Sequence, residues 1–146
     1  SSHWHGVTCE IDARTGECIA VVLAVPDNDL EGPVPGDVTK LVDLRQLDLS
    51  RNLVSGPLPP DLLRGLTDLE GLSLGANLLE GPLAPALGFD PETGAALLSR
   101  ASALKNLDLS YNKLTGRLPA GFLSTGVGGL FPSLVEVDLS ANRLTG

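Results

Sequence analysis

Three aspartates recur at one position of a short repeated motif in this 146-residue chain. Asp48, Asp108 and Asp138 each stand in an apolar-Asp-Leu-Ser segment. If each segment is a β-strand, alternate side chains point to opposite faces, so the three carboxylates share the open face of one sheet. Such an acidic stripe suits a basic or hydroxyl-rich partner, although a solvated face without any partner accounts for the same pattern.

The same open face holds the other side chains that could bind a ligand. Arg51 and Tyr111 depart from the small residue types at their position in the motif, and Arg and Tyr are common hot-spot residues at interfaces. Much of the remaining face repeats a consensus, so its residues can equally serve the scaffold. The candidate ligand-binding residues are Gln46, Asp48, Arg51, Ser73, Asn106, Asp108, Tyr111, Glu136 and Asp138.

Signatures of catalysis are missing from the sequence. It contains no Gly-x-Ser-x-Gly, no phosphate loop ending in Lys-Ser/Thr, and no carboxylate pair marked by a distinct pocket. His3, His5 and Cys9 could ligate a metal on paper, but their irregular spacing in a terminal arm disfavours this reading. We therefore expect a protein that is not an enzyme and that needs neither a metal nor a cofactor.

Five asparagines organise nearly the whole chain. Each follows an apolar-x-apolar-x-x frame, and successive spacings are 24, 25, 35 and 30 residues. This period is typical of a solenoid, in which each unit adds one strand and one turn and stacks only on its neighbours. An amide at the end of a strand can bond the backbone of its own and the next turn. We therefore assign a structural role to Asn28, Asn52, Asn77, Asn112 and Asn142.

The units start near residues 20, 44, 69, 104 and 134, and the last unit is cut short at Gly146. Strand alternation directs the apolar side chains inward and predicts five short parallel strands side by side. After the Asn of each of the first four units comes an apolar-x-Gly-x-apolar-Pro segment, with the Pro one place later in the third unit. Its glycine allows a backbone conformation closed to other residues. These glycines are Gly32, Gly56, Gly81 and Gly116.

Composition and charge narrow the class of protein further. Thirty leucines and only five aromatic residues predict a core of similar aliphatic layers. A net charge of −8 disfavours nucleic acid, whose phosphates would be repelled. No apolar run is long enough to span a membrane, and the chain opens without a visible secretory leader.

The unit resembles the plant-type leucine-rich repeat, LxxLxxLxLxxNxLxGxIPxxLxxL, of plant and algal receptor ectodomains and secreted inhibitors. The resemblance covers residues 4–146 and implies an α/β-type solenoid, a right-handed superhelix with a concave parallel β-sheet. It also implies extra short strands beside the xGxIP segment. The run from Trp4 to Cys9 is similar to the W-x-G-V-x-C signature of the capping segment. We therefore expect an N-terminal cap at residues 1–19 and repeats at 20–146.

The cap departs from the family at one position, because Ser2 stands where a cysteine is usual. Cys9 and Cys18 remain, and a disulfide between them would close a ten-residue loop. By lowering the entropy of the unfolded chain, it would stabilise the fold by about 2.7 kcal/mol. Two free thiols are the alternative. If the disulfide forms, it indicates an oxidising compartment.

Two insertions interrupt the repeat. In residues 88–103, Asp90 as N-cap and Pro91 at the first helical position predict a short helix over Ala95 to Ala103. The second insertion, at residues 124–131, is either a contact loop or growth tolerated on the convex side.

These features together predict a recognition module, the N-terminal part of a receptor-like ectodomain, extracellular or at the cell surface. It would bind a protein or peptide on its concave face, and a co-receptor is a further candidate partner. The alternatives are a secreted inhibitor of a cell-wall-degrading enzyme and a structural wall or scaffold protein. A basic enzyme partner bound in a salt-sensitive manner would favour the inhibitor.

Overall fold

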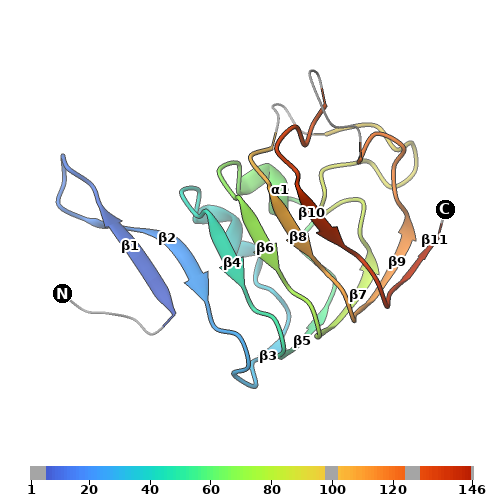
Figure 1. Ribbon diagram of the computed structural model, residues 1–146, viewed down its shortest axis with the longest axis horizontal. Coiled ribbons are helices and arrows are strands. Elements are labelled where there is room, and N and C mark those ends of the chain that lie inside the picture. Colours follow the sequence, from blue (N-terminus) through green and yellow to red (C-terminus); the bar gives the residue numbers. More distant parts are fainter. Residues whose placement is uncertain (1–5, 98–101, 124–128, 146) are drawn as a thin grey trace.

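The computed structural model describes residues 6–97, 102–123 and 129–145. The chain winds into a stack of coils, with two sheets around a leucine core (Figure 1). The first sheet has the strand order β1-β2-β4-β6-β8-β10, and the second has the order β11-β9-β7-β5-β3. Every pairing between coils is parallel, and only β1 runs antiparallel to its neighbour. The predicted solenoid with a parallel sheet is therefore confirmed.

Each coil contributes one strand to each sheet. The first sheet consists of β1 (Val7–Ile11), β2 (Cys18–Ala24), β4 (Gln46–Asp48), β6 (Gly71–Ser73), β8 (Asn106–Asp108) and β10 (Glu136–Asp138). The second consists of β3 (Glu31–Gly32), β5 (Leu53–Gly56), β7 (Leu78–Pro82), β9 (Lys113–Arg117) and β11 (Arg143–Thr145). In the described part of the chain, helical structure is confined to the 3-10 turn η1 (Gly36–Lys40) and to α1 (Leu62–Gly65).

The core is a leucine stack, as the repeat predicts. The inward strand positions Leu47, Leu72, Leu74, Leu107 and Leu109 are buried, and so are Leu62, Leu66 and Leu87 on the convex side. Val137 is an exception at 37% exposed. It lies on β10, the edge strand of the first sheet, with no described coil stacked beyond it.

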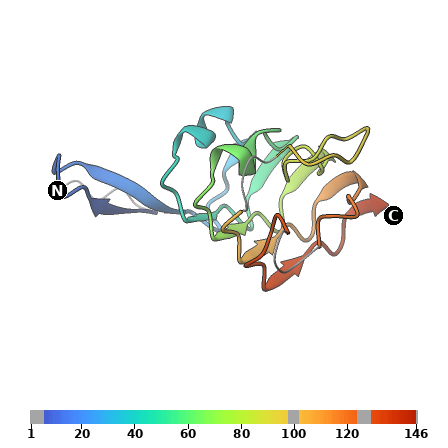
Figure 2. The same ribbon diagram turned by 90° about the horizontal axis from the view of Figure 1, so that it is seen from above.

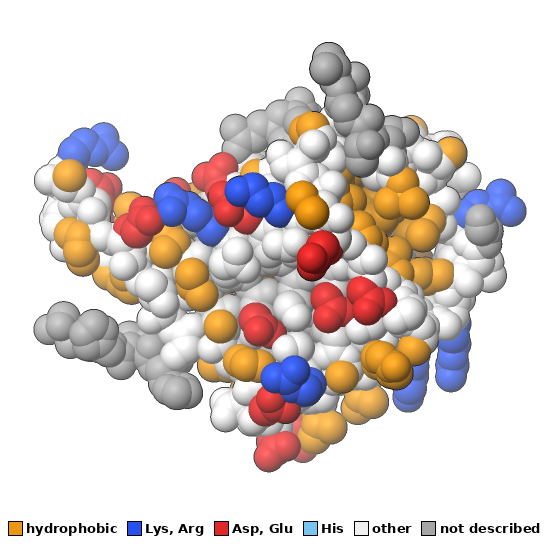
Figure 3. Space-filling model, viewed as in Figure 1, with side chains coloured by type: hydrophobic (Ala, Val, Ile, Leu, Met, Phe, Trp, Pro, Cys, Tyr) orange, Lys and Arg blue, Asp and Glu red, His pale blue; other side chains and the backbone are white. Residues whose placement is uncertain are grey.

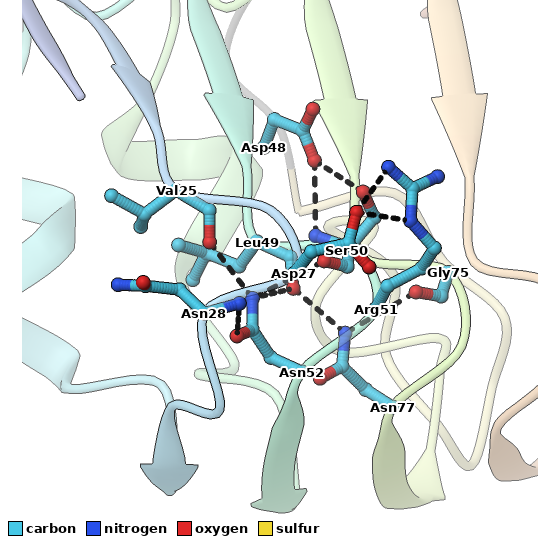
Figure 4. A network of polar contacts seen from close by, with 10 residues as sticks. All are labelled: Val25, Asp27, Asn28, Asp48, Leu49, Ser50, Arg51, Asn52, Gly75 and Asn77. Atoms are coloured by element: carbon cyan, nitrogen blue, oxygen red, sulfur yellow. Dashed lines mark hydrogen bonds and ion pairs between the residues drawn. The ribbon is translucent and has the colours of Figure 1, made fainter.

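Asn52 shows how each coil is bonded to its neighbour (Figure 4). Its side-chain Oδ1 accepts hydrogen bonds from the backbone N–H groups of Asn28 and Leu30, at 2.8 and 3.0 Å. Its Nδ2 donates to the carbonyl oxygens of Val25 and Leu49, both at 2.9 Å. Asn77, Asn112 and Asn142 also donate to a carbonyl oxygen of each coil, but each accepts a hydrogen bond from only one described backbone N–H of the preceding coil.

Two details of the asparagine ladder differ from the prediction. The side chains bond to their own coil and to the preceding coil, whereas the sequence analysis expected the following one. Asn28 is exposed, and its side chain has no hydrogen-bond partner among the described residues. The reason is positional: a hairpin, not a repeat coil, precedes Asn28, so no turn backbone lies where its amide could bind.

The glycines that follow the first four asparagines, Gly32, Gly56, Gly81 and Gly116, take a left-handed conformation. Gly56 and Gly81 have φ angles of 76° and 82°. A Cβ added at Gly81 would lie 3.4 Å from the Cβ of Pro57, an ordinary contact. The backbone angle, and not lack of space, therefore requires glycine at this position.

Strands β1 and β2 form an antiparallel hairpin that projects from the end of the solenoid (Figure 2). A disulfide joins Cys9 to Cys18, with their Cα atoms 5.3 Å apart, so the pair is bridged and not two free thiols. Both η-nitrogens of Arg45 also bond to the carboxylate of Glu10, at 2.7 and 3.2 Å. The disulfide thus joins the two strands of the hairpin, and the Arg45–Glu10 ion pair joins the hairpin to the second coil.

Reduction of the disulfide should destabilise the hairpin more than the solenoid. Loop closure predicts a loss of up to about 2.7 kcal/mol, confined to strands that touch few other elements. Hydrogen–deuterium exchange with and without reductant should show faster exchange in residues 7–24 only. A double variant with serine at both cysteines is the control, because reductant must leave it unchanged. Equal acceleration in β6 and β8 would contradict this expectation.

The predicted helix in the first insertion is absent from the described residues. Asp90 Oδ1 accepts hydrogen bonds from the backbone N–H groups of Glu92 and Thr93, at 2.9 and 2.8 Å, as a helix cap would. Gly94 then takes a φ of 71°, and the chain reverses so that Phe89 bridges Ala96. The motif is an Asx turn, and its hydrogen bonds, chiefly from Thr93, lower the pKa of Asp90. Residues 98–101 of the predicted helix, like 124–128 of the second insertion, lie outside the described residues.

Three phenylalanines extend the core on the convex side, where the sequence predicted only aliphatic layers. Phe89, Phe122 and Phe131 are at most 2% exposed. The ring centroids of Phe131 lie 6.3 Å from Phe89 and 5.2 Å from Phe122, the second pair being edge-to-face. All three come from the two over-long units, so the larger convex side of these units is filled by larger side chains.

Candidate ligand-binding face

The first sheet places the predicted candidates in two straight columns. The first column runs through Val22, Gln46, Gly71, Asn106 and Glu136, and the second through Ala24, Asp48, Ser73, Asp108 and Asp138. Inward leucines alternate with these residues, so both columns point away from the core. Seven of the nine candidates therefore share one surface, which we call the concave face.

The concave face is hollowed across four strands. A cavity of about 540 Å³ lies over β4, β6, β8 and β10, and all seven of these candidates line it. Figure 3 shows acidic side chains gathered along this face. A smaller hollow of about 220 Å³ lies over Gly75, between Arg51 and Asp108. The surface is therefore an open trough and not an enclosed pocket.

Two glycines leave room for these hollows, Gly71 in the larger and Gly75 in the smaller. A Cβ at Gly71 would collide with the side-chain Oε1 of Gln46, and a Cβ at Gly75 would lie 3.0 Å from Oδ1 of Asp108. The Gln46 amide thus lies against the backbone of Gly71, and the Asp108 carboxylate lies against the backbone of Gly75. A larger residue at either glycine would displace a candidate ligand-binding side chain.

Each aspartate of the stripe is held by the serine two residues later. Asp48 Oδ1 accepts hydrogen bonds from the Ser50 backbone N–H at 2.9 Å and from its hydroxyl at 2.6 Å. Asp108 with Ser110 and Asp138 with Ser140 repeat these contacts. The second carboxylate oxygen of each aspartate has no hydrogen bond to a described residue. The arrangement fixes three carboxylates while leaving one oxygen of each available to a partner.

The hydrogen bonds from Ser140, its hydroxyl first and its backbone N–H second, lower the pKa of Asp138. A depressed carboxyl pKa stabilises the fold above the ordinary value of about 3.9, and this contribution is lost as the pH falls through the depressed pKa. Ser140→Ala should therefore raise the pKa of Asp138. An NMR titration of its carboxyl carbon measures the change, with exposed Ser133→Ala as control. An unmoved titration curve would show that Ser140 is not the cause.

Arg51 and Tyr111 lie at the rim of the concave face and not in the columns. Each follows its strand in a left-handed turn, with φ of 53° and 55°. The column is completed by Asp27, Ala76 and Ala141, all with φ between 50° and 55°. Tyr111 is 67% exposed. The left-handed backbone of this column was not predicted from the sequence, because none of its residues is the Gly or Asn that usually marks such a turn.

Arg51 binds the carboxylate of Asp27 with Nε and Nη2, both at 2.7 Å from Oδ2. Both side chains are 60% exposed, so the ion pair is worth at most about 1 kcal/mol. We expect Arg51→Ala to leave the free energy of unfolding nearly unchanged in urea denaturation. Arg64→Ala, which removes a comparable surface pair with Asp61, is the matched control. A loss well above that of the control would show that Arg51 is structural.

Alternating charges border the concave face, a feature that the sequence analysis did not identify. Glu10, Arg45, Glu70 and Lys105 follow one another along the stack, and Lys105 lies 3.5 Å from Glu70. The hydrogen bonds that Arg45 donates to the Glu10 carboxylate raise the pKa of Arg45. Arg45, Glu70 and Lys105 are the second residues of the three middle units, so this part of the signal was present in the sequence. Because this border neutralises itself, the negative potential of the face comes from its columns.

The described residues contain no group of three His, Cys, Asp or Glu side chains placed to hold a metal. His3 and His5 lie outside these residues, and Cys9 is in the disulfide. Among the helices that the structure describes, none is long and apolar enough to cross a membrane.

A sequence model of the Leucine Rich Repeat family matches residues 43–64 and 103–124. Both segments contain a first-sheet strand, its asparagine and a second-sheet strand. The chain is a leucine-rich repeat protein. Over 144 residues, this leucine-rich repeat protein is 33% identical to Receptor-like protein 7 of Arabidopsis thaliana. The match covers 82% of the chain but only 15% of that relative.

Solved structures of plant receptor ectodomains share the leucine-rich repeat fold. The BIR2 ectodomain from Arabidopsis thaliana matches with a TM-score of 0.72 at 28% identity, over 97% of this chain and 63% of that one. The Arabidopsis receptor kinase HAESA, solved with the peptide hormone IDA and the co-receptor SERK1, matches with a TM-score of 0.58 at 29% identity. That match covers 79% of this chain and 16% of HAESA. The chain thus spans less than two thirds of each of these proteins.

Proposed function

We propose that this chain is the ligand-recognition part of a receptor-like protein, extracellular or at the cell surface, and that it binds a protein or peptide on its concave face. The observation that carries the proposal is the trough of about 540 Å³ lined by two columns of polar residues. The peptide complex of HAESA supports it by analogy. The disulfide supports the proposed extracellular or cell-surface location, because such bonds persist under oxidising conditions.

The chemistry of the trough indicates the kind of partner. Asp48, Asp108, Glu136 and Asp138 form no ion pair with a described residue, so a Lys or Arg side chain of the partner would be the complementary group. Arg51 and Tyr111 would supply contacts at the rim. We assign residues 1–19 to a cap and residues 20–146 to repeats. The role is binding without catalysis or a cofactor, and a co-receptor is a second proposed partner.

A random peptide library displayed on phage tests this proposal. Peptides selected on the purified chain should be enriched in Lys and Arg, since the trough is acidic. Their affinity should fall at least tenfold for the triple variant Asp48→Asn, Asp108→Asn and Asp138→Asn, measured by calorimetry at low salt.

The matched control changes three exposed aspartates elsewhere, Asp29→Asn, Asp37→Asn and Asp61→Asn, and alters the net charge by the same amount. Its affinity for the selected peptides should change less than twofold. If both triple variants lose affinity equally, the selected peptides respond to net charge alone, and the assignment to the concave face is wrong.

A further inference from the structure

Three basic side chains of this acidic protein differ from the other described ones because they form no ion pair with a described residue. The described residues include nine of the ten Lys and Arg residues, and six of the nine form ion pairs: Arg14, Lys40, Arg45, Arg51, Arg64 and Lys105. The remaining three, Lys113, Arg117 and Arg143, form none with a described residue and are exposed. All three lie on β9 and β11, neighbouring strands of the second sheet.

The pairing of these strands brings the three cations together. Arg143 is the register partner of Thr115, and Lys113 and Arg117 lie two residues to either side of Thr115 on the same face of β9. Neighbouring strands lie about 4.8 Å apart, and residues two apart on a strand lie about 6.8 Å apart. In the backbone register, three cationic residues therefore flank Thr115. We call Lys113, Thr115, Arg117, Arg143 and Thr145 the basic patch.

Little on the surrounding surface offsets this positive charge. Strands β9 and β11 contain no acidic residue, and the nearest carboxylate in register is Glu80, opposite Lys113 on β7. In Figure 3 blue side chains stand out at the border of the molecule near β9 and β11, away from the red ones of the trough. The patch is thus a local reversal of sign on a chain with a net charge of −8.

The outward side chains of the basic patch are entirely polar. The apolar residues of the two strands, Leu114 and Leu144, alternate with the patch residues and pack on the core. Protein interfaces usually contain an apolar or aromatic centre, and this patch has none. A hydrophilic polyanion fits it better than a folded protein surface. The disulfide indicates an oxidising compartment, which disfavours nucleic acid as that polyanion.

We propose that the basic patch binds a carboxylated polysaccharide, whose carboxylates would pair with the three cations while its hydroxyls bond to Thr115 and Thr145. This inference does not rest on the proposed peptide-binding function, because the patch belongs to the second sheet and shares no residue with the trough. Since exposed charges are screened by salt, the interaction should weaken steeply as ionic strength rises.

Alginate, a linear polymer with one carboxylate per sugar, is the probe, and neutral dextran is the comparison. At low salt the wild-type chain should be retarded in an alginate gel and not in a dextran gel. The triple variant Lys113→Gln, Arg117→Gln and Arg143→Gln should reduce the affinity for alginate at least tenfold. Circular dichroism melting establishes that the variant is folded.

The matched control removes three cations elsewhere, Arg14→Gln, Lys40→Gln and Arg64→Gln, and should bind alginate within twofold of wild type. Three outcomes would overturn the proposal: no retardation of the wild type, equal loss in both triple variants, or binding of poly-glutamate as tight as that of alginate. The last would identify the patch as a site for acidic peptides. None of these outcomes bears on the trough, so failure here leaves the proposed function intact.

Discussion

Asn77→Ala should lower the free energy of unfolding by about 3–5 kcal/mol, because it leaves several buried polar groups without partners. The Asn77 amide donates to the carbonyl oxygens of Leu49 and Leu74, at 2.9 and 3.0 Å, and accepts from the N–H of Val54 at 3.0 Å. The side chain is buried and lies between the two coils that it joins. Water cannot replace these bonds without opening the stack, so the loss should appear in full in urea denaturation.

Asn28 provides a control of the same residue type at the same position of the repeat. Its side chain is exposed and bonds to no described residue, so Asn28→Ala should change the unfolding free energy by less than about 0.5 kcal/mol. The difference between the two variants isolates the ladder from any general effect of removing an asparagine. If Asn77→Ala costs less than about 0.5 kcal/mol, the ladder does not hold the coils together.

Phe131→Ala should cost about 3–5 kcal/mol, since it empties the centre of the aromatic cluster. Phe131 is fully buried and contacts both other rings, which come from different units. Loss of its ring would therefore loosen both insertions at once. Phe131→Leu should cost distinctly less, because most of the volume is retained.

The control for this prediction is Leu123→Ala, one residue after Phe122 in the chain. Leu123 is 62% exposed, so its removal should cost less than about 0.5 kcal/mol. Urea denaturation of the three variants gives the comparison. A cost for Phe131→Ala no greater than that for Leu123→Ala would mean that the cluster contributes nothing to the stability of the fold.

The sequence predicts the repeated part of this fold well, because the same residue pattern recurs in every unit. Leucine alternation, the asparagine and the following glycine each have one physical role, and five copies average out local ambiguity. The two columns of the concave face follow from the same alternation. Stacking places corresponding residues of successive units side by side, so Asp48 and Asp108 could be assigned to one column without a structure.

Features that occur only once were predicted poorly. Asp90 and Pro91 are ordinary helix-start residues, and the chain reverses at Gly94, which has a φ of 71°. Asn28 has the motif of the other asparagines but lacks a preceding coil, which no local pattern reveals. The cluster around Phe131 joins two insertions that are distant in sequence. Such contacts depend on the path of each insertion in three dimensions, and the spacing of residues in the sequence does not determine that path.

The central claim is that the concave face, and not the second sheet, receives the protein or peptide partner of the proposed function. Hydroxyl-radical footprinting with a peptide selected from the library tests it, because exposed side chains that can be oxidised lie both at the rim of the concave face and on the second sheet. Tyr111 is 67% exposed at the rim of the trough, while Leu53 and Leu78 are 43% and 41% exposed on the second sheet. We expect bound peptide to reduce oxidation of Tyr111 several-fold and to leave Leu53 and Leu78 unchanged. Protection of Leu53 and Leu78 with Tyr111 unaffected would contradict the claim.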